Sequence, residues 1–384
     1  MCSSSSGFPP PPPQLSPPRL LQMMLSTQPG GAETFFEKLG LAFAEAGVPQ
    51  CLVIEPNAER ERLFAKYPHV EVVPIRFGGW REWKARRVLK ATFGRFAPDA
   101  ALTWMNRASR RAPRGCCPIV GRLGGYYKIG YYRRCDHLVG ITPDLVAHIR
   151  ASGWPENASS LIPNFGETPP MDGDAGRARE DLRREFGIGP EDTVLLALGR
   201  LHPAKAHDTL IRAMAEVPGT ILLLAGEGPL EADLRELARG LGLADRVRFL
   251  GWRRDVGALF GACDISVFPS RYEPNGNVVM ESWAHRRPLV ASRAKGPDWL
   301  VDDGVNGLLF DIDSVPQLRD RLVQLGSDPE LCARLVRNGE EKWRRGFSRE
   351  AVVGQYLELF ASLARRNNNR KGGGEGRDVP GIRF

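Results

Sequence analysis

Short apolar runs alternate with longer amphipathic stretches along most of this chain of 384 residues. In the first half, the apolar runs are RLLQMML, QCLVIEP, VEVVPI, AALTWM, CCPIV and DHLVGIT. Runs of this length are typical of buried strands, and several of the stretches between them repeat apolar residues at helical spacing. Alternating strands and helices predict a parallel sheet covered by helices.

A second alternating set follows a break in this pattern. Its apolar runs are TVLLALG, TILLLAG, RVRFLG, DISVFPS, PLVAS and GLLF. The break holds Gly, Pro and Asp residues and then a charged helical stretch, ARAREDLRREFGI. We therefore expect an α/β fold with two doubly wound, Rossmann-like domains that face a cleft at the carboxyl ends of their strands.

The same pattern sets the domain boundaries. Residues 1–18 are rich in Ser and Pro, and residues 366–384 have a similar low-complexity character, so we expect both tails to be disordered. The segments between them are an N-terminal domain (19–165), a linker (166–190), a C-terminal domain (191–347) and a closing helix (348–365) that packs back toward the N-terminal domain.

Composition narrows the class of protein. Lys and Arg (53) outnumber Asp and Glu (45), so the net charge is +8, which suits anionic partners and equally a solvated basic face. The seven cysteines lack zinc-ligand spacing and fit free thiols in a reducing compartment. No apolar run approaches the roughly 18 residues of a membrane span, and no signal-peptide pattern opens the chain. We expect a cytoplasmic protein in which any membrane contact is peripheral.

Two loops at predicted strand ends carry residues suited to an anion. Gly30 and Gly31 follow the first strand and would let backbone N–H groups approach a ligand, although a tight turn explains them as well. Arg200 and Lys205 follow the first strand of the second domain, in LGRLHPAKAHDTLIRAM. Both could reach a phosphate, and the alternative is a pair of solvated basic residues.

The stretch RYEPNGNVVMESW places a carboxylate on each side of a predicted loop-to-helix junction. Gly276 permits a close approach, Asn277 is a candidate helix cap, and the N–H groups of Val278 and Val279 would point outward. Glu273 and Glu281 could accept hydrogen bonds from sugar hydroxyls on either side of a bound phosphate. The alternative is that Glu281 only complements the helix dipole and Glu273 is a surface charge.

These stretches together resemble one family. EPNGNVVME, followed by RRPLVAS and GPDWLVDDGVNGLLF, is similar to the GT-B-fold glycosyltransferases of retaining family 4. GRLHPAKAHDTLIRAM, LLLAGEGPLEADLRELA and VRFLGW resemble that family in order and spacing, and LIPNF resembles the end of its N-terminal domain. The resemblance covers roughly residues 19–365 and implies a GT-B fold that uses a nucleotide-diphosphate sugar of the UDP or GDP type. It implies no cofactor and no metal.

The resemblance also implies a role for particular residues. Glu273 would position the donor sugar, and Glu281 would hold the ribose. Arg200 and Lys205 would neutralise the diphosphate, and with Glu273 they are the expected catalytic residues. Further donor contacts are implied at Gly30, Gly31, Trp252 (beside the nucleobase), Asn275, Gly276, Asn277 and Val278.

Two departures from the family pattern concern the acceptor and the phosphate loop. Many relatives carry a histidine where this chain reads GRLGGYY, so we expect Arg122, Gly124 and Gly125 on the acceptor side instead. Ala206 replaces a glycine after Lys205, and we expect the phosphate contact of that lysine to survive. His137 and His148 are expected to be structural, and the acidic patterns Asp172–Asp174 and Asp311–Asp313 are expected to be loop acids rather than metal ligands.

Basic residues far outnumber the two acids, Glu82 and Asp99, between positions 76 and 134. Aromatic residues lie among them, namely Trp80, Trp83, Phe93 and Trp104. This pattern suits docking on anionic lipid, an acidic glycan such as a lipopolysaccharide core, or RNA, and it is also consistent with an ordinary solvated surface.

We expect a retaining transfer of a hexosyl type from the nucleotide sugar to a glycan or lipid-linked acceptor, in cell-envelope polysaccharide or lipopolysaccharide synthesis. A nucleotide-sugar 2-epimerase of the same fold and a non-catalytic nucleotide or RNA binder are the alternatives, and nucleic acid is the less expected partner.

Overall fold

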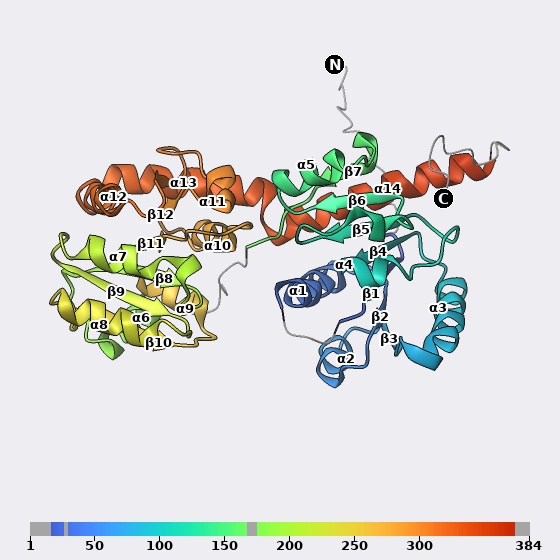
Figure 1. The fold of residues 1–384 in the computed structure, drawn as a ribbon, viewed down its shortest axis with the longest axis horizontal. Coiled ribbons are helices and arrows are strands. Elements are labelled where there is room, and N and C mark those ends of the chain that lie inside the picture. Colours follow the sequence, from blue (N-terminus) through green and yellow to red (C-terminus); the bar gives the residue numbers. More distant parts are fainter. Residues whose placement is uncertain (1–16, 27–29, 167–174, 373–384) are drawn as a thin grey trace, which may run out of the picture. The chain divides into compact units, whose positions relative to one another are not determined.

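The computed structural model describes residues 17–26, 30–166 and 175–372. The first half of the chain forms a seven-stranded parallel sheet in the order β3-β2-β1-β4-β5-β6-β7 (Figure 1). Its strands are β1 Leu20–Met24, β2 Gln50–Ile54, β3 Val70–Pro74, β4 Ala100–Trp104, β5 Ile119–Leu123, β6 His137–Gly140 and β7 Ser159–Leu161. Of the run CCPIV, only the last two residues enter a strand, because Pro118 has no N–H for the ladder.

Helices cover this sheet on both faces. They are α1 Gly31–Glu45, α2 Ala58–Phe64, η1 Gly79–Arg81, α3 Glu82–Phe96, α4 Met105–Ser109, η2 Ile129–Tyr132, α5 Pro143–Ala151 and η3 Glu156–Ala158. Figure 1 shows α1 and α2 on one side of strands β1 to β3 and α3 on the other. This split is the one that right-handed crossovers require, because the chain reverses direction across the sheet after β3.

The core of this sheet holds two aromatic residues that the sequence analysis placed on a basic surface. Trp104 ends β4 and is 1% exposed, with its ring edge-on to Phe36 at 5.5 Å and its Nε1 donating to Gln22 Oε1 at 3.0 Å. Phe93 lies on the inner face of α3 and is also 1% exposed. The expected surface is therefore wrong at these two positions and keeps Trp80 and Trp83, which are exposed.

The closing helix α14, Arg349–Gly372, groups with the N-terminal residues from Tyr356 onward. The rings of Tyr356 and Phe360 lie 6.0 and 6.3 Å from that of Phe43 on α1. The helix continues past residue 365, where we expected it to end. No helix among the described residues combines the length and apolar character needed to cross a bilayer.

The second half forms a six-stranded parallel sheet in the order β10-β9-β8-β11-β12-β13. Its strands are β8 Thr193–Leu198, β9 Thr220–Ala225, β10 Val247–Gly251, β11 Ile265–Phe268, β12 Leu289–Ser292 and β13 Leu308–Phe310. Its helices are α6 Ala175–Glu185, η4 Pro203–Lys205, α7 His207–Met214, α8 Glu231–Gly240, α9 Val256–Ala262, α10 Asn277–Ala284, α11 Lys295–Leu300, α12 Val315–Ser327 and α13 Pro329–Gly346.

The charged helix α6 lies in the segment expected to be a linker, but it packs on the second sheet. Arg179 donates to the carbonyl groups of Gly261, Ala262 and Cys263 and pairs with Asp264 at 2.5 Å. Its guanidinium therefore satisfies the carbonyl groups that end α9. Residues 175–185 are part of the helical layer of the second sheet.

Strand order in the second sheet fixes where a ligand is expected. From β8 the chain builds outward to β9 and β10, and from β11 it builds the other way to β12 and β13. The loops after β8 and β11 therefore leave the same edge at the point where the direction reverses. In open α/β sheets this switch point is the usual ligand site.

Candidate functional site

The two switch-point loops are joined through their backbones. The loop after β8 leads into η4, and Ala204 in it accepts hydrogen bonds from the N–H groups of Arg271 (2.9 Å) and Tyr272 (3.1 Å). These two donors lie in the loop after β11. Residues far apart in the sequence are thus held in one rigid unit at the carboxyl edge of the sheet.

Arg271 locks the same two loops with its side chain. Its guanidinium contacts both carboxylate oxygens of Asp208 at 3.0 and 2.8 Å, and it pairs with Asp313 at 2.7 Å. The hydrogen bond to Asp208 outweighs the opposing effect of burial and raises the pKa of Arg271 above its usual value. The sequence analysis did not select Arg271 or Asp208, although both lie within the stretches that it quoted.

This network includes Asp313, which belongs to one of the two acidic patterns considered for metal binding. Asp313 is held by Arg271 and by Thr209, whose hydroxyl donates to Asp313 Oδ1 at 3.0 Å. Among the described residues, no three His, Cys, Asp or Glu side chains gather as a metal site would require. Asp172–Asp174 lies outside the described residues.

Close packing of backbone supports the loop after β8. A Cβ atom on Gly226 would lie 1.9 Å from Gly199 O, and one on Gly228 would lie 2.3 Å from Leu201 O. Neither position has room for a side chain, because the loop after β9 lies directly against the loop after β8. The stretch AGEGPL therefore supports the backbone that carries Arg200.

Lys205 and Glu273 form the central contact of the site. Lys205 Nζ lies 2.6 Å from Glu273 Oε2, and both side chains are largely buried. Glu273 Oε1 accepts the N–H groups of Asn275 (3.1 Å) and Gly276 (3.2 Å). The carboxylate thus shapes its own loop through one oxygen and holds the lysine with the other.

Helix α10 begins differently from our expectation. Gly276 is the N-cap, with φ at 70°, and Asn277 is the first helical residue rather than the cap. The Val279 N–H donates to Gly276 O at 3.0 Å, so it does not point outward. The N–H groups of Asn277 and Val278 have no acceptor among the described residues, which makes them the N–H donors left for a ligand at this end of the helix.

Other residues predicted to bind the sugar donor lie in helices and loops around the second sheet. Glu281 is half-buried in α10, the helix that follows the Glu273 loop. Arg200 is exposed and takes part in no ion pair among the described residues. Trp252 follows β10 with its side chain 72% exposed, and its N–H donates to Glu227 Oε1 at 3.3 Å. Their contacts with a donor stay predictions.

His207 is a residue that the sequence analysis missed. It begins α7 directly after Ala206, and it is 3% exposed. Burial lowers its pKa to about 4, and the charge of Lys205 acts in the same direction. The ring is therefore neutral at physiological pH and adds no charge beside Lys205.

The glycine-rich loop of the first sheet opens helix α1. Gly30 is the N-cap, and a Cβ atom on it would lie 2.8 Å from Oε2 of the buried Glu33. Gly31 is exposed and has open space around it. Their predicted place beside the donor remains a prediction.

Arg122 is not at the surface. It lies on β5, is 2% exposed, and its guanidinium carbon lies 4.6 Å from the ring centres of both Phe35 and Trp104. Burial lowers its pKa. This packing favours a structural role for Arg122, so Gly124 and Gly125, which are partly exposed, are the better candidates for the acceptor side.

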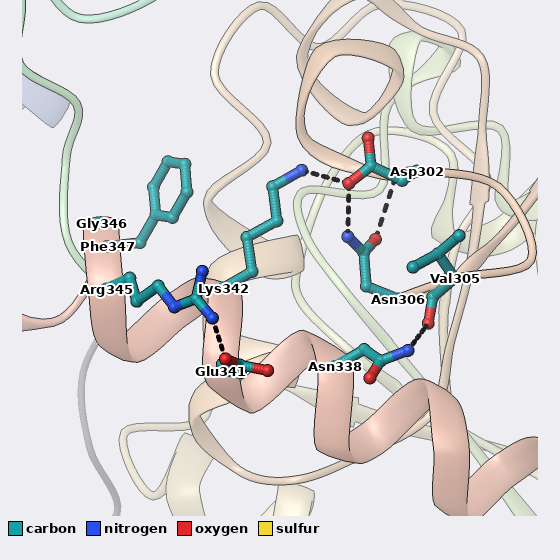
Figure 2. Close-up of a pocket in the computed structure, with 9 residues that line it drawn as sticks. All are labelled: Asp302, Val305, Asn306, Asn338, Glu341, Lys342, Arg345, Gly346 and Phe347. Atoms are coloured by element: carbon teal, nitrogen blue, oxygen red, sulfur yellow. Dashed lines mark hydrogen bonds and ion pairs between the residues drawn. The ribbon is translucent and has the colours of Figure 1, made fainter.

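A hollow of about 530 Å³ lies elsewhere in the C-terminal half, between α13 and the loop that precedes β13 (Figure 2). Lys342 pairs there with Asp302 at 2.8 Å, and Asn338 donates to the Val305 carbonyl at 2.9 Å. Figure 2 shows the polar side chains bonded to one another and to backbone. The hollow shares no residue with the Lys205–Glu273 pair, and we assign it no chemistry.

Two parallel α/β sheets, with paired charged residues at a strand switch point, define the class of GT-B glycosyltransferases. The family model for glycosyl transferases group 1 matches residues 178–342. The lipopolysaccharide core biosynthesis glycosyltransferase LpsE of Rhizobium meliloti (strain 1021) is 36% identical over 342 residues, which are 87% of this chain and 96% of that protein. LpsD of the same organism is 37% identical over 341 residues, 86% of this chain and 95% of that protein. The chain therefore belongs to the GT-B glycosyltransferases, and it is a glycosyltransferase with relatives in lipopolysaccharide core synthesis.

Solved structures agree on the fold. The structure of Anabaena Alr3699/HepE in complex with UDP aligns with a TM-score of 0.76 at 21% identity and covers 90% of this chain and 100% of that one. WaaG, a glycosyltransferase involved in lipopolysaccharide biosynthesis, aligns with a TM-score of 0.63 at 16% identity and covers 89% of this chain and 99% of that one. The predicted GT-B fold is confirmed.

Proposed function

We propose that this glycosyltransferase moves a hexosyl group from a UDP- or GDP-sugar to a glycan or lipid-linked acceptor, with retention of the anomeric configuration. The observation that carries the proposal is the Lys205–Glu273 pair at the switch point of the second sheet. The UDP and UDP-glucose complexes of Alr3699/HepE support a nucleotide sugar as donor. The names of LpsE and LpsD support an acceptor in the lipopolysaccharide core.

The first requirement of such a reaction is to stabilise a leaving nucleoside diphosphate. Negative charge grows on its terminal phosphate as the bond from the sugar carbon breaks. Lys205 and Arg200 supply positive charge, and the amides of Asn277 and Val278 supply fixed dipoles at a helix start. These groups are in place before the donor binds, so no metal is required.

Glu273 acts as a positioning group in this proposal. Its carboxylate already accepts two loop N–H groups and the Lys205 ammonium, and an ionised carboxylate has about four acceptor positions. One remains for a sugar hydroxyl. In a front-side reaction, the leaving phosphate takes the proton of the acceptor hydroxyl while the new glycosidic bond forms on the same face, so Glu273 need not act as a nucleophile.

The place of the reaction is part of the proposal. We place the protein in the cytoplasm, at the inner face of the cytoplasmic membrane, where a nucleotide sugar and a lipid-linked acceptor would meet. The 2-epimerase and the non-catalytic binder are less well supported, because two relatives that align with more than four fifths of the chain are named as glycosyltransferases.

A donor screen tests the proposal. Wild-type protein is incubated with a panel of UDP- and GDP-sugars, and release of the nucleoside diphosphate is measured together with the released sugar. We expect slow release from one donor, which an envelope glycan acceptor accelerates, and the anomeric proton coupling of the product gives its configuration. Free sugar epimerised at C2 would instead indicate the epimerase, and no release from any donor would contradict the transferase.

A further inference from the structure

Three large apolar side chains are exposed within one stretch of nine residues, 80–88, in the N-terminal half of the chain. Trp80 is 71% exposed, Trp83 is 54% exposed and Val88 is 48% exposed. Eleven large hydrophobic residues of the described chain are at least 38% exposed, and the other eight are spread between positions 126 and 323. Scattered exposed hydrophobics need no explanation, but a local group points to a partner.

The geometry of α3 puts Trp83 on the face opposite the core and Val88 at the side of the exposed face. Its buried residues, Ala85, Leu89 and Phe93 among them, recur at four-residue spacing and face the sheet. Trp83, Arg87 and Lys90 are separated by four and three residues and so share the outer face. Trp80 belongs to η1, the turn that leads into the helix.

Cations surround the exposed rings. Lys84 Nζ lies 5.7 Å from the ring centre of Trp80 and 5.4 Å from that of Trp83, and the guanidinium of Arg81 lies 5.0 Å from Trp80. The guanidinium of Arg87 lies 6.0 Å from Trp83. The charged groups are therefore arranged around the apolar ones, as an interfacial surface requires.

The charge of this surface is not neutralised by the protein. Arg81, Lys84, Arg87 and Lys90 are exposed, and no described acid forms an ion pair with any of them. The acid within the segment, Glu82, is held by Arg86 at 3.3 Å and by Arg111 at 3.1 Å. Four cations remain for an anionic partner.

We propose that η1 and α3 form a docking surface for an anionic lipid bilayer. Trp80, Trp83 and Val88 enter the headgroup region, and the four unpaired cations contact lipid phosphates. We call these seven residues the α3 surface. Tryptophan is enriched at this depth of a membrane, and each nearby cation is attracted to an anionic leaflet. The proposal is independent of the donor chemistry.

Other anionic partners fit this surface less well. RNA binding needs free aromatic faces for bases, but Arg81, Lys84 and Arg87 lie over the faces of Trp80 and Trp83. Phe93 and Trp104, which would extend an aromatic platform, are in the core. An acidic glycan would pair with the cations but would leave Val88 in water.

Vesicle co-sedimentation of the full chain tests the proposal. The probes are vesicles of phosphatidylcholine alone and of phosphatidylcholine mixed with phosphatidylglycerol, each at low and at high salt. We expect binding to the anionic vesicles alone, weakening as salt rises. No binding to anionic vesicles at low salt would overturn the proposal.

A charge-reversal double variant and a matched control test whether the α3 surface is the site of vesicle binding. K84E combined with R87E should weaken binding at least about tenfold, because two attractive charges become repulsive. R239E combined with R334E makes the same change of charge on exposed residues of the C-terminal half and should bind like wild type. Equal loss in both double variants would show a general charge effect and overturn the proposal. Melting curves of all variants establish that they are folded.

Tryptophan fluorescence tests the contribution of the apolar residues to vesicle binding separately. Binding of wild type to anionic vesicles should shift tryptophan emission to shorter wavelength, and W80A combined with W83A should remove that shift and weaken binding. Single-stranded RNA is the competing probe in fluorescence polarisation. Tight RNA binding that K84E/R87E abolishes, without vesicle binding, would replace the bilayer by RNA.

Discussion

Lys205 and Glu273 neutralise one another in the free protein, and this pairing affects how each can act. In the proposed reaction, a donor diphosphate would bring negative charge to the lysine and so would compete with Glu273 for it. Glu273 keeps its two loop N–H donors, Asn275 and Gly276, whether or not the lysine moves. Donor binding would therefore release one carboxylate oxygen at the moment when a sugar hydroxyl arrives.

His207 predicts how the stability of the folded protein depends on pH. Its pKa in the folded protein is about 4, against about 6.5 in the unfolded chain, so only the unfolded chain gains this proton between those values. The stability contributed by the neutral ring is complete above pH 6.5 and is lost as the pH falls toward 4, by at most about 3 kcal/mol. We expect H207Q to show a smaller fall in melting temperature between pH 7 and pH 5 than wild type.

The matched control is H202Q. His202 lies in the same loop, but its side chain is exposed. This variant should keep the pH dependence of wild type, to which the buried His137 also contributes, because burial lowers its pKa to about 4. An equal pH dependence in H207Q and wild type would contradict the assignment.

At the scale of elements, Ala206 is a strained position of the site. It joins η4 to α7 with φ at 51° and ψ at 37°, in the left-handed region that favours glycine. We expect A206G to stabilise the protein by about 1 kcal/mol because it relieves this strain, which corresponds to a rise in melting temperature of roughly 2–4 °C. Nucleoside diphosphate affinity should not change.

Ala215 provides the control for this substitution. It follows α7 with φ at −58°, an ordinary helical conformation, and it is exposed. A215G should lower the melting temperature slightly, since glycine only adds freedom to the unfolded chain there. A fall in both variants would show that Ala206 is not strained.

The elements also show how far the sequence could be interpreted. All strands except β7 followed from their apolar runs, because a strand buried on both faces has little choice of residues. The start of α10 did not follow, because Gly276 enters the helix through a left-handed conformation and leaves Asn277 inside it. Phe93 could have been assigned to the core from its spacing with Ala85 and Leu89, whereas the burial of Trp104 depends on β4 being a central strand.

The candidate site was predictable only in part. Lys205 and Glu273 stood out because they lie in motifs at strand ends. Their mutual contact, and the bracing of both loops by Arg271 through Asp208 and Asp313, join residues up to 105 positions apart. Such pairing depends on strand order, which local patterns do not contain.

At the scale of the whole molecule, the proposed tasks fall on two separate sheets. The residues that we propose for binding a nucleotide sugar lie in loops and helices of the second sheet, and the α3 surface that we propose for docking lies beside the first sheet. Membrane docking and sugar transfer are therefore separable by mutation. Variants of the α3 surface should retain nucleoside diphosphate affinity, and variants of Lys205 should retain vesicle binding.

The most direct test compares transfer with nucleoside diphosphate binding in E273Q. Glutamine keeps an oxygen for the Asn275 and Gly276 amides but loses the charge that pairs with Lys205. With the donor that wild type uses, we predict that transfer falls at least about a hundredfold, as for loss of a group that positions the reacting centre. Calorimetry should find the UDP or GDP affinity unchanged or higher, because Lys205 is free for phosphate. Full transfer activity, or loss of transfer and binding together, would contradict the account.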